Sequence, residues 1–125
     1  MKKVLVVDDD PDILEAVQLV LMSDGYNSEA ITKGDETYKK IKEYKPDLII
    51  LDVLLSGNDG RTICKNLKKA PATKKIPIIF MSALSGQVTK RTVAMQAEDF
   101  FTKPLDLPRL QLRIGELLRS EAASK

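Results

Sequence analysis

The sequence predicts an α/β fold in which a parallel sheet is covered by helices on both faces. Three apolar runs rich in β-branched residues, Val4–Val7, Leu48–Leu51 and Ile78–Met81, are continuous in the way of strands buried on both faces. Helical patterns fill the gaps between the strands, so the predicted order is five strand–helix pairs. Strict alternation favours right-handed crossovers and a parallel sheet.

The first half of the chain contains two predicted helices. Asp10 is a suitable N-cap with Pro11 at the first helical position, and Gly25 ends the periodic pattern. A weaker strand follows at Ser28–Ile31. Thr32 and Asp35 then resemble a capping box for a helix that runs to about Tyr44 and is closed by Lys45-Pro46.

The second half continues the alternation. Asp59-Gly60 opens a third helix that runs to about Lys69, and a weakly amphipathic fourth helix is predicted at Gln87–Ala97. Phe100-Phe101 mark a last strand at Asp99–Thr102, and Asp106 caps the last helix. One face of that helix carries Leu107, Leu110, Ile114, Leu117 and Leu118.

Composition indicates one folded domain. The 125 residues are 43% hydrophobic and 30% charged, with a net charge of +2. We expect the domain to span residues 1–121, followed by a frayed tail at 122–125. The balance of charge does not favour nucleic-acid or membrane binding. The N-terminal apolar run Val4–Val7 is too short for a signal peptide, so we expect a cytoplasmic protein.

Two residue counts exclude further chemistries. The single cysteine, Cys64, cannot form an intramolecular disulfide, and its place in an apolar helical pattern favours core packing. The chain has no histidine, which excludes histidine catalysis, histidine metal ligands and a phosphohistidine on this chain.

Polar side chains follow the buried strands at their carboxyl ends. The first strand ends in Asp8-Asp9, the third in Asp52, the fourth in Ser82 and the fifth in Thr102-Lys103. In an open parallel sheet these ends share one edge, where ligands bind. We therefore expect three carboxylates, a hydroxyl and an ammonium to meet there.

Such a group favours phosphoryl chemistry with a divalent cation. Clustered carboxylates repel one another unless a cation lies among them, and an all-oxygen site suits Mg²⁺. Lys103 can pair with an anionic oxygen of a ligand and Ser82 can donate a hydrogen bond to another. Asp52 lies between the other groups in sheet order, which makes it the natural nucleophile.

These pieces together resemble the response-regulator receiver domain of two-component signalling. The resemblance covers nearly all of residues 1–120 and rests on Val6-Val7-Asp8-Asp9-Asp10, Leu51-Asp52-Val53, Asp59-Gly60, Met81-Ser82-Ala83 and Lys103-Pro104. It implies a flavodoxin-like (βα)5 sandwich with a five-stranded parallel sheet in order 2-1-3-4-5.

The resemblance also implies a role for each site residue. Asp52 would be the phosphoacceptor, with Lys103 and Ser82 in contact with the phosphoryl group. Mg²⁺, for which Mn²⁺ could substitute, would be bound by Asp52, by Asp9 directly, by Asp8 through water and by the backbone carbonyl of Leu54. Ser82 and Phe100 would form the switch, and the Lys103–Pro104 bond matches one that is cis in the family.

The implied donor is a sensor histidine kinase or a histidine phosphotransfer protein acting in trans. Phosphorylation would draw Ser82 toward the phosphoryl group and let Phe100 turn inward. The surface of the fourth helix, fifth strand and fifth helix would then bind an output protein or domain, or a second copy of the chain. Leu112, off the apolar face of the last helix, is a candidate for that contact. Both a stand-alone regulator and one domain of a longer regulator fit the sequence.

The sequence departs from the family in places. Ser56-Gly57 replaces a frequent Pro-Gly, and Gln96-Ala97 replaces a frequent Gly-Ala before the last strand. Leu54 and Leu84, two positions after Asp52 and Ser82, are apolar and cannot hold an attacking water, so we expect a long-lived phosphoryl group.

Two other functions on the same fold have weaker sequence support. A flavin- or nucleotide-binding protein would need a Gly-rich phosphate loop after the first strand, where Asp8-Asp9-Asp10 stands. A phosphatase with an aspartyl intermediate would need a general acid beyond its nucleophile, and Val53-Leu54 offers none.

Overall fold

A computed structural model describes residues 1–55, 57–83 and 97–123 of the chain. The strands are β1 (Lys3–Val7), β2 (Asn27–Ile31), β3 (Leu48–Asp52), β4 (Leu54–Leu55), β5 (Asn58–Asp59), β6 (Ile78–Ser82) and β7 (Asp99–Thr102). The helices are α1 (Pro11–Ser23), the short 3₁₀ turn η1 (Gly34–Glu36), α2 (Thr37–Tyr44), α3 (Gly60–Lys69) and α5 (Leu107–Ala123). The fourth helix predicted at Gln87–Ala97 lies, except for Ala97, outside the described residues, as do Ser56, Leu84 and Gln96.

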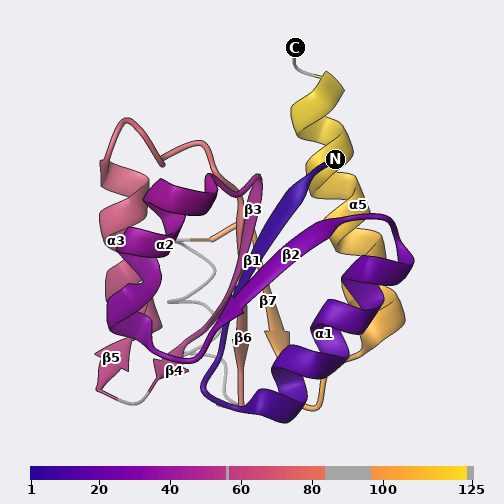
Figure 1. The fold of residues 1–125 in the computed structure, drawn as a ribbon, viewed down its shortest axis with the longest axis horizontal. Coiled ribbons are helices and arrows are strands. Elements are labelled where there is room, and N and C mark those ends of the chain that lie inside the picture. Colours follow the sequence, from indigo (N-terminus) through magenta and orange to yellow (C-terminus); the bar gives the residue numbers. More distant parts are fainter. Residues whose placement is uncertain (56, 84–96, 124–125) are drawn as a thin grey trace.

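Five parallel strands form the central sheet in the order β2-β1-β3-β6-β7. With β6 and β7 as the fourth and fifth predicted strands, this order confirms the predicted 2-1-3-4-5 topology. Figure 1 shows α2 and α3 on one face of the sheet and α1 and α5 on the other. The fold is therefore the three-layer α/β sandwich expected from the alternating pattern.

The core is divided by the sheet into two apolar layers. Strand residues alternate between the layers: Leu5 and Ile49 pack toward α2 and α3, whereas Val6 and Ile50 pack toward α1 and α5. The central strand β3 is buried along its whole length, which explains why its sequence is continuously apolar up to Asp52. Burial on both faces holds the strands in register and their carboxyl ends at one edge.

Local capping signals hold the helix starts where the sequence predicts them. Asp10 accepts a hydrogen bond from the amide of Asp12 at 2.9 Å, and Asp59 accepts one from the amide of Arg61 at 2.8 Å. Asp106 likewise accepts from the backbone at the start of α5. Each cap lies at the end of a strand or within four residues of one, so it also sets where the chain turns from the sheet into the next helix.

The predicted capping box at Thr32 and Asp35 is wrong. The segment forms η1 instead, and α2 begins later, at Thr37, with no side-chain cap from Glu36. Gly34 is buried so closely against the small β4–β5 hairpin that an added Cβ would lie 2.8 Å from the Cβ of Asn58. This contact, which no local pattern reveals, favours a tight turn over a regular helix start.

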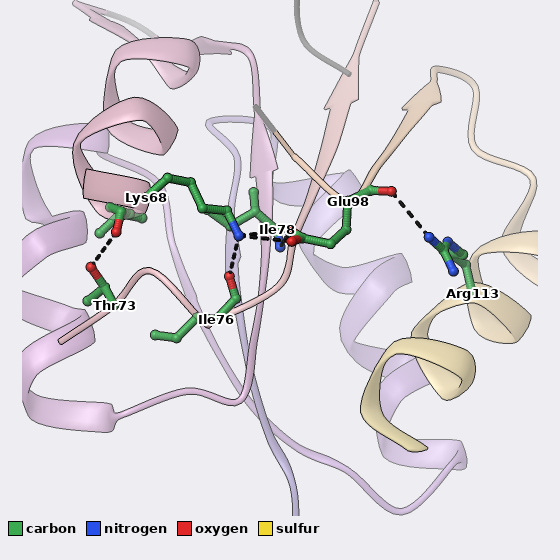
Figure 2. A network of polar contacts seen from close by, with 7 residues as sticks. Lys68, Thr73, Ile76, Ile78, Glu98 and Arg113 are labelled. Atoms are coloured by element: carbon green, nitrogen blue, oxygen red, sulfur yellow. Dashed lines mark hydrogen bonds and ion pairs between the residues drawn. The ribbon is translucent and has the colours of Figure 1, made fainter. Parts of the chain in front are cut away.

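A polar network holds the amino ends of β6 and β7. The Glu98 carboxylate accepts hydrogen bonds from the Ile78 amide at 2.7 Å and from Lys68 Nζ at 3.0 Å. Arg113 of α5 donates to the Glu98 carbonyl at 3.2 Å, and Figure 2 shows how Glu98 joins α3, β6 and α5. The two strands held here carry Ser82 and lead into Lys103 at their other ends.

The last helix is longer than expected. It continues to Ala123, two residues past the predicted domain end at 121. Among the residues described, no helix combines the length and apolar character needed to cross a membrane.

Candidate functional site

The structure brings together the polar residues that follow the buried strands. Asp8, Asp9 and Asp52 each offer a carboxylate oxygen within 4.8 Å of the others. Lys103 reaches the same point: its Nζ lies 2.7 Å from Asp8 Oδ2 and 3.3 Å from Asp52 Oδ2. Residues more than 90 positions apart therefore form one cluster at the carboxyl edge of the sheet, because all five strands run in the same direction.

The members of the cluster differ in exposure. Asp8 and Ser82 are fully buried and Asp52 is 4% exposed, whereas Asp9 is exposed at the mouth of the site. Buried polar groups are stable only when they are paired or hydrogen-bonded. Three buried polar residues, Asp8, Asp52 and Ser82, therefore lie at the strand ends, and the exposed Asp9 lies beside them.

Backbone amides hold the two buried carboxylates. The amide of Asp10 donates to Asp8 Oδ1 at 2.9 Å, and the amide of Leu54 donates to Asp52 Oδ1 at 3.2 Å. In each carboxylate the other oxygen, Oδ2, faces the Lys103 ammonium. The turns after β1 and β3 therefore fix the orientation of both acids before any ligand binds.

The site carries more negative charge than Lys103 compensates. Burial, followed by the charge of Asp8, raises the pKa of Asp52 from its usual 3.8 to about 6, although Lys103 acts in the opposite direction. Burial acts to lower the pKa of Lys103, but the hydrogen bond and charge of Asp8 outweigh it, so the pKa is raised. Lys103 thus stays protonated while Asp52 is an anion that is costly to bury.

This donor set fits a hard divalent cation. Carboxylate oxygens from three residues are the ligands that Mg²⁺ and Mn²⁺ accept. Burial first and the charge of Asp8 second raise the pKa of Asp52, and a second positive charge among the three acids would offset both effects. The acidic group of Asp8, Asp9 and Asp52 could therefore hold a metal ion.

Ser82 and Lys103 are held next to each other by strand pairing. Ser82 at the end of β6 pairs with Thr102 at the end of β7, and the Lys103 amide donates to the Ser82 carbonyl at 2.8 Å. The Lys103–Pro104 peptide bond is cis, as the resemblance to receiver domains implies. Ser82 and Lys103 thus reach the carboxyl edge of the sheet side by side, at the ends of two neighbouring strands.

Phe100, the residue expected to turn inward on phosphorylation, is already buried. Its side chain is 5% exposed and packs in the apolar layer under α2 and α3, with Ala97 against the same layer. The inward position is therefore the one that the described structure contains.

Sequence reasoning missed the role of Gly60 and of the β4–β5 hairpin. An added Cβ on Gly60 would lie 2.2 Å from the backbone oxygen of Asp52, and the Gly60 amide donates to the Val53 carbonyl at 2.7 Å. The start of α3 is thus pressed against the backbone that carries Asp52. The Asp59-Gly60 pair is visible in the sequence as a helix start, but its long-range contact is not.

Three further residues that the sequence singles out can be placed in the structure. Cys64 is fully buried, and burial raises the pKa of its thiol to about 11, so it is a packing residue with little thiolate at neutral pH. Leu112 is 62% exposed on α5. Leu54, next to Asp52, is 49% exposed and lies at the surface of the site.

Comparison with known proteins agrees with this geometry. Residues 4–115 match the family model for the response regulator receiver domain. The chain is 32% identical over 120 residues to the phosphate regulon transcriptional regulatory protein PhoB of Rhizobium meliloti, covering 95% of this chain and 53% of that protein. It is 36% identical over 125 residues to the alkaline phosphatase synthesis transcriptional regulatory protein PhoP of Bacillus subtilis, covering 98% and 51%. The chain spans about half the length of these curated relatives.

Solved structures give the same result. A response regulator from Chloroflexus aurantiacus superposes with a TM-score of 0.88 at 34% identity, covering 94% of this chain and 98% of that one. The signal receiver domain of a histidine kinase from Syntrophus aciditrophicus superposes with a TM-score of 0.87 at 33% identity, covering 96% and 92%. With its parallel sheet and acidic strand ends, the chain belongs to the family of response-regulator receiver domains of two-component signalling.

Proposed function

We propose that the chain is a phosphorylation switch in which Asp52 accepts a phosphoryl group from a phosphohistidine of a partner protein. The observation that carries this proposal is the meeting of three carboxylates with one ammonium, Lys103, which lies within 3.3 Å of both Asp8 and Asp52. The receiver unit would span residues 1–121 and act in the cytoplasm.

A bound cation would complete the site. Asp9 and Asp52 would bind Mg²⁺ directly, Asp8 through a water, and the backbone carbonyl of Leu54 would add a further oxygen. The cation would offset the negative charge of the phosphoryl oxygens, and Mn²⁺ could serve in the same place.

The transfer itself uses the oriented carboxylate of Asp52. One of its oxygens attacks phosphorus in line, the new P–O bond forms, and the P–N bond to the donor imidazole breaks. Lys103 Nζ, already beside Asp52 Oδ2, pairs with a phosphoryl oxygen as charge moves onto it. Because this chain has no histidine, the donor is a sensor histidine kinase, a histidine phosphotransfer protein or a small acyl phosphate.

The phosphorylated state would be read through Ser82 and Phe100. The Ser82 hydroxyl would move toward the phosphoryl group, which would favour the buried position of Phe100, already occupied here, over an outward one. Phosphorylation then shifts an existing equilibrium rather than creating a new conformation. The affected surface comprises β7, α5 and the segment that precedes β7, where an output protein, an output domain or a second copy would bind.

Other activities on this fold have less support. Three acids rather than a glycine-rich loop follow β1, which disfavours a nucleotide or flavin phosphate at that turn. Val53 is fully buried and Leu54 is apolar, so the two residues after Asp52 provide no general acid for a phosphatase.

The test is phosphorylation by acetyl phosphate, read as added mass on the intact protein. We expect labelling of the wild type with Mg²⁺, little labelling in EDTA and none for Asp52→Asn. Asp59→Asn is the matched control, because Asp59 caps α3 outside the acidic cluster and asparagine also caps helices. Labelling that persists in Asp52→Asn, or that ignores the cation, would exclude the mechanism.

A further inference from the structure

A second concave site lies at the end of the molecule opposite the acidic cluster. It is a pocket of about 400 Å³ between the carboxyl end of α2 and the loop that joins α3 to β6. Figure 1 shows that loop at the far end of the sheet from the β4–β5 hairpin. Because Pro46 and Ile76 line the pocket shortly before β3 and β6 begin, it is separated from Asp52 by the length of the sheet.

The pocket has an apolar floor and a cationic rim. The buried side chains of Ile41 and Pro46 and the half-buried side chain of Ile76 form the floor, and the exposed residues Lys42, Lys45 and Ala72 form the rim. Its volume lies toward the small end of ligand pockets, which run from about 300 to about 1,000 Å³. A single large apolar side chain with the backbone that carries it would fill such a space.

Positive charge is concentrated around this pocket. Residues 60–77 contain six basic residues and no acidic ones, and of these six Lys69 precedes the loop that lines the pocket while Lys74 and Lys75 lie within it. Within the described ranges, none of these three lysines, nor Lys42 or Lys45, makes an ion pair. A net charge of only +2 for the whole chain therefore hides a locally basic face.

Only some of these lysines can be explained as residues that stabilise the end of a helix. Cations in the last turn of a helix favour its dipole, which gives Lys42 and Lys69 a local role. Lys45, Lys74 and Lys75 lie beyond the helices. The acids next to Lys42 and Lys45 in the sequence have other contacts: Glu43 Oε2 lies 4.0 Å from Lys40 Nζ, and Asp47 accepts the Lys3 amide at 2.8 Å.

We propose that this basic pocket, defined by Ile41, Lys42, Lys45, Pro46, Ala72, Thr73 and Ile76, docks an acidic polypeptide segment that inserts one apolar side chain. Charge complementarity argues for the acidic flanks and the apolar floor argues for the anchor. A nucleic acid would use the charge but leave the floor uncovered, and among the described residues that line the pocket none is aromatic, so a base has no ring there to stack on. Docking here needs no phosphorylated Asp52, since the two sites lie at opposite ends of the sheet.

The proposal is tested with a short fluorescein-labelled peptide rich in Asp and Glu with one central Leu, and with the same peptide carrying Ser for Leu. Fluorescence anisotropy on the full chain measures both affinities at about 0.05 M and about 0.3 M salt. Three proteins are compared with the wild type. They are Lys42→Gln with Lys45→Gln, Ala72→Trp, and a control that removes two exposed charges elsewhere, Lys33→Gln with Arg109→Gln.

We expect the Leu peptide to bind the wild type in a salt-dependent manner and the Ser peptide to bind at least about tenfold more weakly. Removing both rim lysines should weaken binding about tenfold. Ala72→Trp, which fills the pocket from an exposed position, should weaken it as much without changing charge, while the control pair should have little effect. The proposal fails if the Leu and Ser peptides bind alike. It also fails if the control pair weakens binding as much as the rim pair, or if a single-stranded oligonucleotide binds as tightly and ignores Ala72→Trp.

Discussion

Replacing Asp52 by Asn should stabilise the protein when no divalent cation is present. Burial and the charge of Asp8 raise the pKa of Asp52 from 3.8 to about 6 in the folded state. The folded protein therefore binds this proton more tightly than the unfolded chain, and stability falls as pH rises from about 4 through about 6. A pKa raised by about 2 corresponds to about 3 kcal/mol at neutral pH. This figure already includes the opposing charge of Lys103, and Asn leaves that ammonium with one partner fewer, so we expect a net gain of about 1–3 kcal/mol.

Urea denaturation in EDTA measures the free energy of unfolding of the wild type and of Asp52→Asn. It is monitored by circular dichroism between about pH 4.5 and about pH 8. The gain from Asp52→Asn should be full at the upper end and fade toward the lower end, where Asp52 is protonated. Mg²⁺ should reduce the difference in unfolding free energy between the two proteins, because it stabilises the wild type alone. The Asp59→Asn control should instead lower the free energy of unfolding at high pH. The Arg61 side chain lowers the pKa of Asp59, and the substitution removes the ion pair between them. An Asp52→Asn variant that is less stable than the wild type at high pH, or a gap that does not change with pH, would refute the reasoning.

Four further substitutions test single positions. Lys103→Met leaves the acids unpaired and should lower stability by about 2–4 kcal/mol in EDTA. Mg²⁺ should recover part of that loss. If urea titrations show the same loss of stability with and without Mg²⁺, the cation and Lys103 do not share a site. Gly60→Ala, whose Cβ would lie 2.2 Å from a backbone oxygen of β3, should cost about 2 kcal/mol or more. Gly115→Ala, which meets only a flexible arginine side chain within α5, should gain about 0.5–1 kcal/mol by the same assay. The phosphorylated wild type should lose its phosphate slowly, and Leu54→Asn should speed the loss by holding a water. Mass spectrometry over time measures both rates, and wild-type loss within seconds would be the contrary result.

The central sheet and the acidic cluster were predictable from short-range patterns. Continuous apolar runs predict strands buried on both faces, and each run is followed at once by a polar residue. Once the strands are parallel, Asp8, Asp52 and Lys103 share an edge whatever their separation along the chain. Capping residues such as Asp10 and Asp59 are equally local, because the bonds they make reach only two residues ahead.

What the sequence could not predict depends on contacts between distant segments. The late start of α2 follows from the packing of Gly34 against Asn58, which overrides the local capping signal at Thr32. The raised pKa of Asp52 arises from burial and from Asp8, two consequences of assembly rather than of neighbouring residues.

The basic pocket shows the same division. The lysines and their spacing are visible in the sequence, where they look like ordinary solvent-exposed residues of helices and loops. Only the folded chain places Lys42 and Lys45 beside Ala72 and Ile76 around a common hollow. Sequence alone therefore determined which residues are polar, apolar or helix-starting, because those preferences act over a few residues. Tertiary structure decided which of them meet, since that depends on how whole layers pack.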